Sequence, residues 1–204
     1  SPVGPAYQPG WNRAGPIAGQ ETYDLRALSL LFPLTPLDRL RNDLGVLNAP
    51  ALALTTLPPN LADMREVSYS SSIGLLNRLR AFFDQQIVDL GGFTNSEFIA
   101  HVVQAADETW LVCDQGVASI VSAVGVLDAL REEGVDTANV QLIVNKFDAD
   151  LGLAAAQIAQ RLEIPLLASL PERRITLGQA VNQGHLLADA AARDPYVRAL
   201  EPLI

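Results

Sequence analysis

The chain has 204 residues, of which 49% are hydrophobic and 18% are charged. This composition supplies enough apolar material for one buried core and excludes an intrinsically disordered chain. Acidic residues outnumber basic residues 23 to 14, which gives a formal net charge of -9. The charge excludes binding to a nucleic-acid backbone as the main function, so we expect no direct nucleic-acid partner.

Three residue types are rare enough to limit the possible sites. Lys146 is the only lysine and Cys113 the only cysteine, while His101 and His185 are the only histidines. An intrachain disulfide and a cysteine/histidine zinc cluster are therefore excluded. No stretch approaches the roughly 18 to 20 apolar residues of a membrane span, and the first residues lack the pattern of a secretory signal. We expect a cytoplasmic protein.

The chain divides into an arm and a globular region. Prolines and glycines alternate through residues 1–20, which indicates an extended arm or linker. From residue 21 to residue 204, short apolar runs alternate with longer amphipathic runs. This alternation predicts an α/β domain of three layers, with a mostly parallel sheet between helices. Strands are predicted at 51–56, 86–90, 109–113, 140–145 and 165–169.

Capping signals place the helices between these strands. Thr35 and Pro36 start a short helix, and Asp194 and Pro195 start the last one. A long helix is predicted at 68–83. A capping box of Thr94 and Glu97 precedes a helix predicted at 98–105. Apolar residues that recur at helical spacing predict a further helix over 151–162. The helix predicted at 118–133 ends before Gly134 and is apolar enough either to pack on the sheet or to face a partner.

An acidic residue and two glycines end the strand predicted at 86–90. Asp89 is suitable for holding a magnesium ion directly or through water, and Gly91 and Gly92 permit close approach of the backbone to a phosphate. An aspartate that caps a turn from strand to helix explains the same pattern, so both interpretations stay open.

A second polar group ends the strand predicted at 140–145. Asn145 carries an amide that can both donate to and accept from a purine edge, and Lys146 and Asp148 follow it. Together with the glycines, this stretch resembles the Asp-x-x-Gly and Asn-Lys-x-Asp motifs of GTPases, in which the last aspartate reads the guanine amino group. A polar turn that closes a strand is the alternative. A third polar loop, residues 170–173 with Pro171, follows the strand predicted at 165–169.

The order of these stretches resembles the C-terminal two-thirds of MinD/ParA-type P-loop ATPases. The similarity is greatest to the CpaE/TadZ branch, the pilus-assembly proteins of Tad secretion systems, and it covers about residues 21–204. The resemblance is carried by segments 87–92, 110–115, 140–146, 165–173, 179–188 and 192–200.

The resemblance implies a role for each polar group. Asp89 corresponds to the Walker B aspartate near magnesium, Asn145 to the residue that contacts adenine, and Pro171 to the loop that closes over the base. Lys146 stands where the family has arginine. ATP and Mg²⁺ are the implied cofactors of the complete family member, although this chain itself need not bind either. A homodimer and proteins of a pilus or secretion machine are the implied partners. Recruitment to the cell pole or an inner-membrane assembly is the implied location.

The chain departs from this family at the phosphate loop. The motif Gly-x-x-x-x-Gly-Lys-Ser/Thr is absent, and Lys146 lies in a different loop. Either the chain is part of a longer protein, which we favour, or it is a pseudo-ATPase. We therefore expect a scaffold or positioning factor for pilus assembly with little or no ATPase activity and no assigned catalytic residue. The alternative hypothesis is a GTPase-like hydrolase that uses Asp89 and the 145–148 motif.

Overall fold

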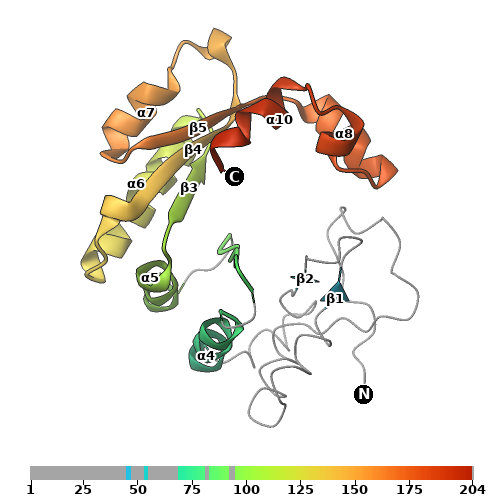
Figure 1. Ribbon diagram of the computed structural model, residues 1–204. Coiled ribbons are helices and arrows are strands. Elements are labelled where there is room, and N and C mark those ends of the chain that lie inside the picture. The colour runs from blue at the N-terminus through green and yellow to red at the C-terminus, as the bar shows by residue number, and fades with distance from the viewer. Residues whose placement is uncertain (1–44, 47–52, 55–68, 81–82, 92–94, 204) are drawn as a thin grey trace. The chain divides into compact units, whose positions relative to one another are not determined.

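The computed structural model describes residues 45–46, 53–54, 69–80, 83–91 and 95–203. The chain divides into two compact units, Ser1–Asp89 and Leu90–Ile204, and each is described by itself. In the first unit, β1 (Gly45–Val46) pairs antiparallel with β2 (Ala53–Leu54) (Figure 1). The predicted arm at 1–20 and the helix predicted at Thr35 lie outside the described residues, as does most of the strand predicted at 51–56.

The first unit also contains the helix α4 (Tyr69–Leu79). Ser72, Leu75 and Leu79 are buried and recur at helical spacing, so they form one buried face of α4. The helix ends at Leu79, short of the predicted end at Phe83.

The strand predicted at 86–90 is wrong for this structure, because residues 85–90 have no regular secondary structure. A strand exists only through hydrogen bonds to a neighbouring strand. The parallel sheet among the described residues contains three later strands and does not include this segment. The side chain of Ile87 is accordingly 83% exposed.

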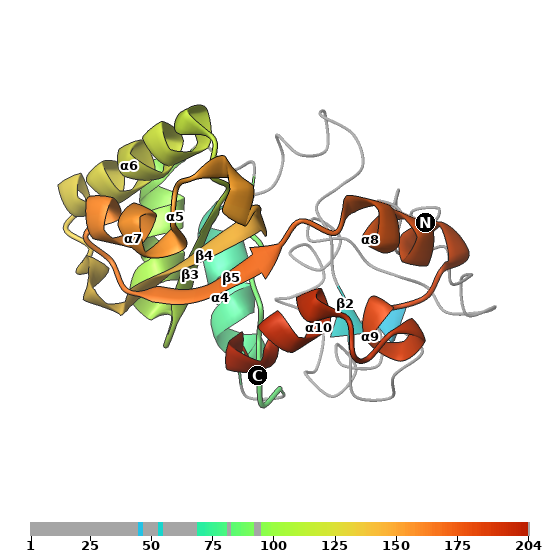
Figure 2. The same ribbon diagram turned by 90° about the horizontal axis from the view of Figure 1, so that it is seen from above.

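The second unit alternates helices and strands (Figures 1 and 2). In chain order its elements are α5 (Ser96–Ala105), β3 (Thr109–Cys113), α6 (Val117–Glu132), η2 (Thr137–Asn139), β4 (Val140–Phe147), η3 (Ala149–Leu151), α7 (Ala155–Leu162), β5 (Leu166–Pro171), α8 (Arg174–Gln183), α9 (Leu187–Ala190), α10 (Pro195–Ala199) and η4 (Glu201–Leu203).

The three strands form a parallel sheet in the order β3-β4-β5, which confirms the predicted α/β class. The structure begins β3 and β4 at the predicted residues, whereas β4 continues past Asn145 to Phe147. Helices α6 and α7 are the crossover connections and cover one face of the sheet (Figure 2). Residues of α10 and η4 pack on the other face, against Ile143, Ala168 and Leu170.

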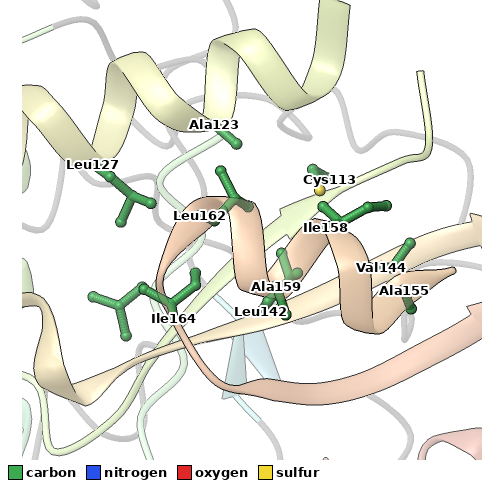
Figure 3. Close-up of a cluster of buried hydrophobic side chains, with 11 residues drawn as sticks. Cys113, Ala123, Leu127, Leu142, Val144, Ala155, Ile158, Ala159, Leu162 and Ile164 are labelled. Carbon is green, nitrogen blue, oxygen red and sulfur yellow. The ribbon is translucent and has the colours of Figure 1, made fainter. Parts of the chain in front are cut away.

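The main core lies between the sheet and the two crossover helices (Figure 3). Alternate residues of β4 enter this core because successive side chains of a strand point to opposite faces. Leu142 and Val144 are fully buried there, and Ile158 and Leu162 of α7 pack against them. Helix α6 contributes Ala123 and Leu127.

The helix ends test two of the predicted signals. Helix α5 begins after Asn95, whose side chain accepts the backbone N–H of Phe98 at 2.7 Å. Asn95 therefore replaces the predicted cap Thr94, which lies outside the described residues. Gly134 does end α6, with a φ of +78° and an N–H that donates to the carbonyl of Arg131 at 3.0 Å.

Helix α6 packs on the sheet through one face only. Leu127 is buried in the core against the sheet, whereas Val117 and Val121 are exposed. Packing on the sheet therefore explains part of the apolar character of this helix. None of the helices in the described ranges is long and apolar enough to cross a membrane.

Candidate site at the carboxyl ends of the parallel strands

Polar residues follow each strand of the parallel sheet at its carboxyl end. Gln115 lies two residues beyond β3, Asn145 and Asp148 flank the end of β4, and Glu172 follows β5. Because the three strands are parallel, these ends share one edge of the sheet. Ligands of open α/β sheets bind outside the carboxyl ends of strands, so this edge is the candidate site.

Asn145 is half-buried near the end of β4, and its side chain bends toward the backbone. Its Oδ1 accepts the N–H of Lys146 at 2.9 Å. Because an N–H donor requires an oxygen acceptor, this bond fixes the orientation of the amide. Within the described part of the chain, the NH₂ group of Asn145 has no hydrogen-bond partner. The amide therefore presents a donor for a ligand.

The backbone is irregular directly after Asn145. Lys146 has a φ of +52°, a left-handed conformation that is uncommon for a residue with a side chain. The pairing of β4 with β5 shifts in register between Val144 and Phe147. Lys146 is exposed and belongs to β4, so the only lysine lies within a strand and not in a loop. Unusual backbone conformations are found more often near functional sites than elsewhere.

Asp148 has a local structural function. Its Oδ1 accepts the N–H of Asp150 at 2.9 Å and caps the short helix η3. Its own N–H donates to Oε1 of Gln115 at 2.7 Å. One oxygen of the carboxylate thus orders the turn, in agreement with the alternative that a polar turn closes the strand.

Gln115 is a site residue that the sequence analysis missed. It is buried, and its amide bonds to both ends of one segment: Oε1 accepts the N–H of Asp148, and Nε2 donates to the carbonyl of Leu153 at 2.6 Å. Asp148 and Leu153 lie 33 and 38 positions after Gln115 in the chain. The only local signal is a glutamine just beyond a predicted strand, which is too common to indicate such a contact.

Pro171 is the last residue of β5 and pairs with Phe147 of β4, so its predicted position in a loop is wrong. The strand continues because the N–H of Glu172 still donates to the carbonyl of Phe147, at 3.0 Å. Glu172 in turn accepts the N–H of Arg174 at 2.8 Å at the start of α8. The ends of β4 and β5 are therefore bonded directly to one another.

The loop after β5 is also connected to the last helix. The guanidinium of Arg173 donates to both carboxylate oxygens of Asp194, with Nε at 3.2 Å from each. Asp194 also caps α10, as predicted, by accepting the N–H of Tyr196 at 2.9 Å. The hydrogen bonds from Arg173 and then from Tyr196 lower the pKa of Asp194, and the carboxylate raises the pKa of Arg173.

Asp89 and Gly91, which were predicted to contact magnesium and phosphate, belong to none of the three strands of this sheet. Asp89 is exposed and is the last residue of the first unit, while Gly91 lies in a turn of the second. Gly92 lies outside the described residues. Across the described ranges, no group of three or more His, Cys, Asp or Glu side chains is arranged to hold a metal ion.

No protein-family model matches the chain, and no curated protein matches its sequence at a significant level. Solved structures do match. A ParA family ATPase from Chlorobium tepidum TLS aligns over 90% of this chain and 75% of that chain, with a TM-score of 0.79 and 17% identity. The MinD cell division protein of Aquifex aeolicus aligns over 89% of this chain and 72% of that chain, with a TM-score of 0.62 and 20% identity.

The chain has the ParA/MinD fold. A third structure with this fold is the septum site-determining protein MinD of Pyrococcus horikoshii OT3, which was solved in complex with Mg-ADP. It aligns over 89% of this chain and 77% of that chain, with a TM-score of 0.58 and 15% identity. Within the ParA/MinD fold of this chain, the polar edge lies at the connected carboxyl ends of β3, β4 and β5.

Proposed function

We propose that this chain binds the base end of an adenine nucleotide at the carboxyl edge of β3, β4 and β5. The observation that carries the proposal is the likeness to a ParA family ATPase over 90% of the chain. The polar residues at that edge give the likeness a chemical basis, because this is where open α/β sheets bind ligands.

Asn145 is the proposed base-recognition residue. Its Oδ1 is engaged by Lys146, so its NH₂ group is the part that contacts the ligand. Adenine presents ring nitrogens as acceptors, and an amide NH₂ donates well to such an acceptor. The proposed base-binding residues also include Lys146, Asp148 and Pro171. These residues lie near Asn145 at the paired ends of β4 and β5.

Asp89, Gly91 and Gly92 remain the proposed contacts for magnesium and phosphate. Magnesium in nucleotide sites is held by one or two carboxylates together with phosphate oxygens and waters. Asp89 supplies one carboxylate, which fits such a site in chemical type and number.

Hydrolysis of ATP by this chain is expected to be negligible. Charge that develops on the γ-phosphate is normally stabilised by a lysine of the phosphate loop. The only lysine is Lys146, which lies in β4. Release of inorganic phosphate measured with and without Mg²⁺ tests this expectation, and robust magnesium-dependent turnover would contradict it.

The proposed cellular role is that of a CpaE/TadZ-like scaffold or positioning factor in pilus assembly, acting as a nucleotide-controlled homodimer. Its support is the resemblance of segments such as 165–173 and 192–200 to that branch. The Aquifex aeolicus MinC:MinD complex illustrates that a protein with this fold binds a protein partner. Deletion of the gene should abolish surface pili in the source cell, and normal piliation would refute this role.

The GTPase-like alternative is not favoured. A ParA family ATPase and MinD proteins are among the structures that match. In addition, Oδ1 of Asp148 already caps η3, which gives the Asn-Lys-x-Asp stretch a structural explanation.

Calorimetric titration with ATP and, separately, with GTP tests the proposal. We expect weak binding of ATP, with a Kd on the order of 1 mM, because the sequence contains no phosphate-loop motif to grip the β- and γ-phosphates. Asn145→Ala should weaken binding about tenfold, the effect of losing one hydrogen bond to a ligand. Asn139→Ala is the matched control, since Asn139 is exposed at the opposite end of β4. Equal loss in both variants, or no binding of ATP by the parent chain, would contradict the proposal.

A further inference from the structure

A single buried side chain connects the end of β3 to the segment that follows β4. Gln115 is only 8% exposed and makes two short hydrogen bonds, to the N–H of Asp148 and to the carbonyl of Leu153. Both polar atoms of its amide are therefore used. A buried amide with two satisfied bonds has one preferred position, and so do the groups bonded to it.

The segment between these two anchors is short and has its own internal bonds. Asp148 caps η3, and Gly152 then adopts a left-handed conformation with a φ of +73°. Gln115 thus holds the first and last residues of a single compact turn. Without Gln115, the N–H of Asp148 and the carbonyl of Leu153 would each lose the partner that the structure shows.

This turn is directly continuous with the proposed base-recognition residue. Asp148 follows Asn145 by three residues, and the intervening Lys146 has the left-handed backbone conformation. On the opposite side, the carbonyl of Phe147 accepts the N–H of Glu172 from β5. The chain between Asn145 and Asp148 is therefore held at Phe147 by β5 and at Asp148 by Gln115.

We infer that Gln115 is a positioning residue that fixes Asn145 for recognition of the adenine base. The inference rests on the proposed function and extends it, because Gln115 does not itself contact the nucleotide. It acts through Asp148. Its loss should mainly reduce the discrimination between adenine and guanine, with only a small effect on the stability of the fold.

The decisive variant is Gln115→Met, which keeps the length and approximate volume of the side chain but removes both hydrogen bonds. Gln115→Glu keeps an acceptor for the N–H of Asp148 and places a second oxygen against the carbonyl of Leu153. Gln157→Met is the matched control. Gln157 is exposed, and its Oε1 accepts the N–H of Ala154, just beyond the anchored turn, at 3.0 Å.

The affinities for ATP and for GTP are measured by calorimetry for the parent chain and the three variants, and the melting temperature is recorded for each. We expect Gln115→Met to weaken ATP binding about tenfold and to bring the ratio of the two affinities close to 1. Gln115→Glu should retain part of the preference for ATP, and Gln157→Met should retain all of it. A lower melting temperature with an unchanged ratio would show a purely structural function and overturn the inference.

The two proposals fail in distinguishable ways. If the parent chain does not bind ATP, the proposed function fails and the inference fails with it. If the parent chain binds ATP through Asn145 while Gln115→Met binds it with the same affinity and selectivity, the inference alone is overturned.

Discussion

Arg173 and Asp194 form an ion pair that connects the loop after β5 to the first turn of α10. The Asp194 side chain is only 4% exposed, and it also caps the helix through the N–H of Tyr196. One carboxylate thus stabilises a tertiary contact and a helix end at the same time.

Removal of the charge of Asp194 should lower the melting temperature in a pH-dependent way. Asp194→Asn keeps an acceptor for the helix cap but loses the charge-assisted bonds to Arg173. The folded protein holds the pKa of Asp194 below its ordinary value of 3.8. The stability from this pair is therefore complete above pH 3.8 and is lost as the pH falls through the lower pKa of the folded state.

Thermal denaturation of the parent chain and of Asp194→Asn from pH 7 to pH 2 checks this prediction. The difference in melting temperature should be largest near neutral pH and should shrink below pH 4. Asp128→Asn is the control, because Asp128 is exposed and its pair with Arg131 spans one helical turn. An exposed pair of this kind contributes only about 0.2–0.5 kcal/mol. A difference that does not depend on pH would contradict the prediction.

The core between the sheet and α7 should dominate the stability of the second unit. Leu142 is completely buried, so Leu142→Ala should reduce the free energy of unfolding by about 2–5 kcal/mol. Leu151→Ala, at a leucine that is 65% exposed, should change it by no more than about 0.5 kcal/mol. Urea denaturation measures both values. Similar losses in the two variants would mean that the core is not organised around β4.

Substitution by alanine at two glycines of the α6 region should change the stability of the protein in opposite directions. Gly134 has a φ of +78°, so Gly134→Ala should destabilise the protein by about 1–2 kcal/mol through backbone strain alone. Gly125 lies within α6, and a Cβ there would meet nothing within 4 Å. Gly125→Ala should therefore stabilise by about 0.5–1 kcal/mol. Urea denaturation decides the signs, and a stabilising Gly134→Ala would refute the proposed helix end.

Cys113 should react slowly with thiol reagents in the folded protein. Burial raises the pKa of its thiol, and the negative charge of Asp114 raises it further. The reactive thiolate is therefore scarce at neutral pH. Modification by a chromogenic disulfide should be at least about tenfold faster in denaturant than in buffer. Equal rates in the two conditions would show that the strand end is open to solvent.

Local sequence signals predicted the elements whose determinants lie close together in the chain. The apolar run of β3 and the glycine that ends α6 are examples, because each depends on neighbouring residues. The segment 86–90 also contains apolar residues (Ile87, Val88 and Leu90), but it is not a strand in the structure, since strand formation also requires a pairing partner. Pattern alone carries no information about that partner.

Only part of the candidate site was predicted, because a local pattern carries no information about contacts between distant residues. Asn145 and Asp148 were identified because they lie at the end of an apolar run that predicts a strand, which is a local feature. The contacts that hold them, from Gln115 and from the backbone of Glu172, connect residues far apart in the sequence. The pair of Arg173 and Asp194 spans 21 positions and was likewise missed. Such contacts follow from tertiary structure and leave no periodic signal.

The most direct test of the account is the backbone amide NMR spectrum of the isotopically labelled chain, recorded during addition of ATP. If the base binds at the carboxyl edge, the signals of Gln115, Asn145 and Glu172 should shift progressively and saturate together. The signals of Thr109, Val140 and Leu166, at the opposite ends of β3, β4 and β5, should remain in place. Shifts confined to those opposite ends, or no shifts at millimolar ATP, would contradict adenine-nucleotide binding at this edge.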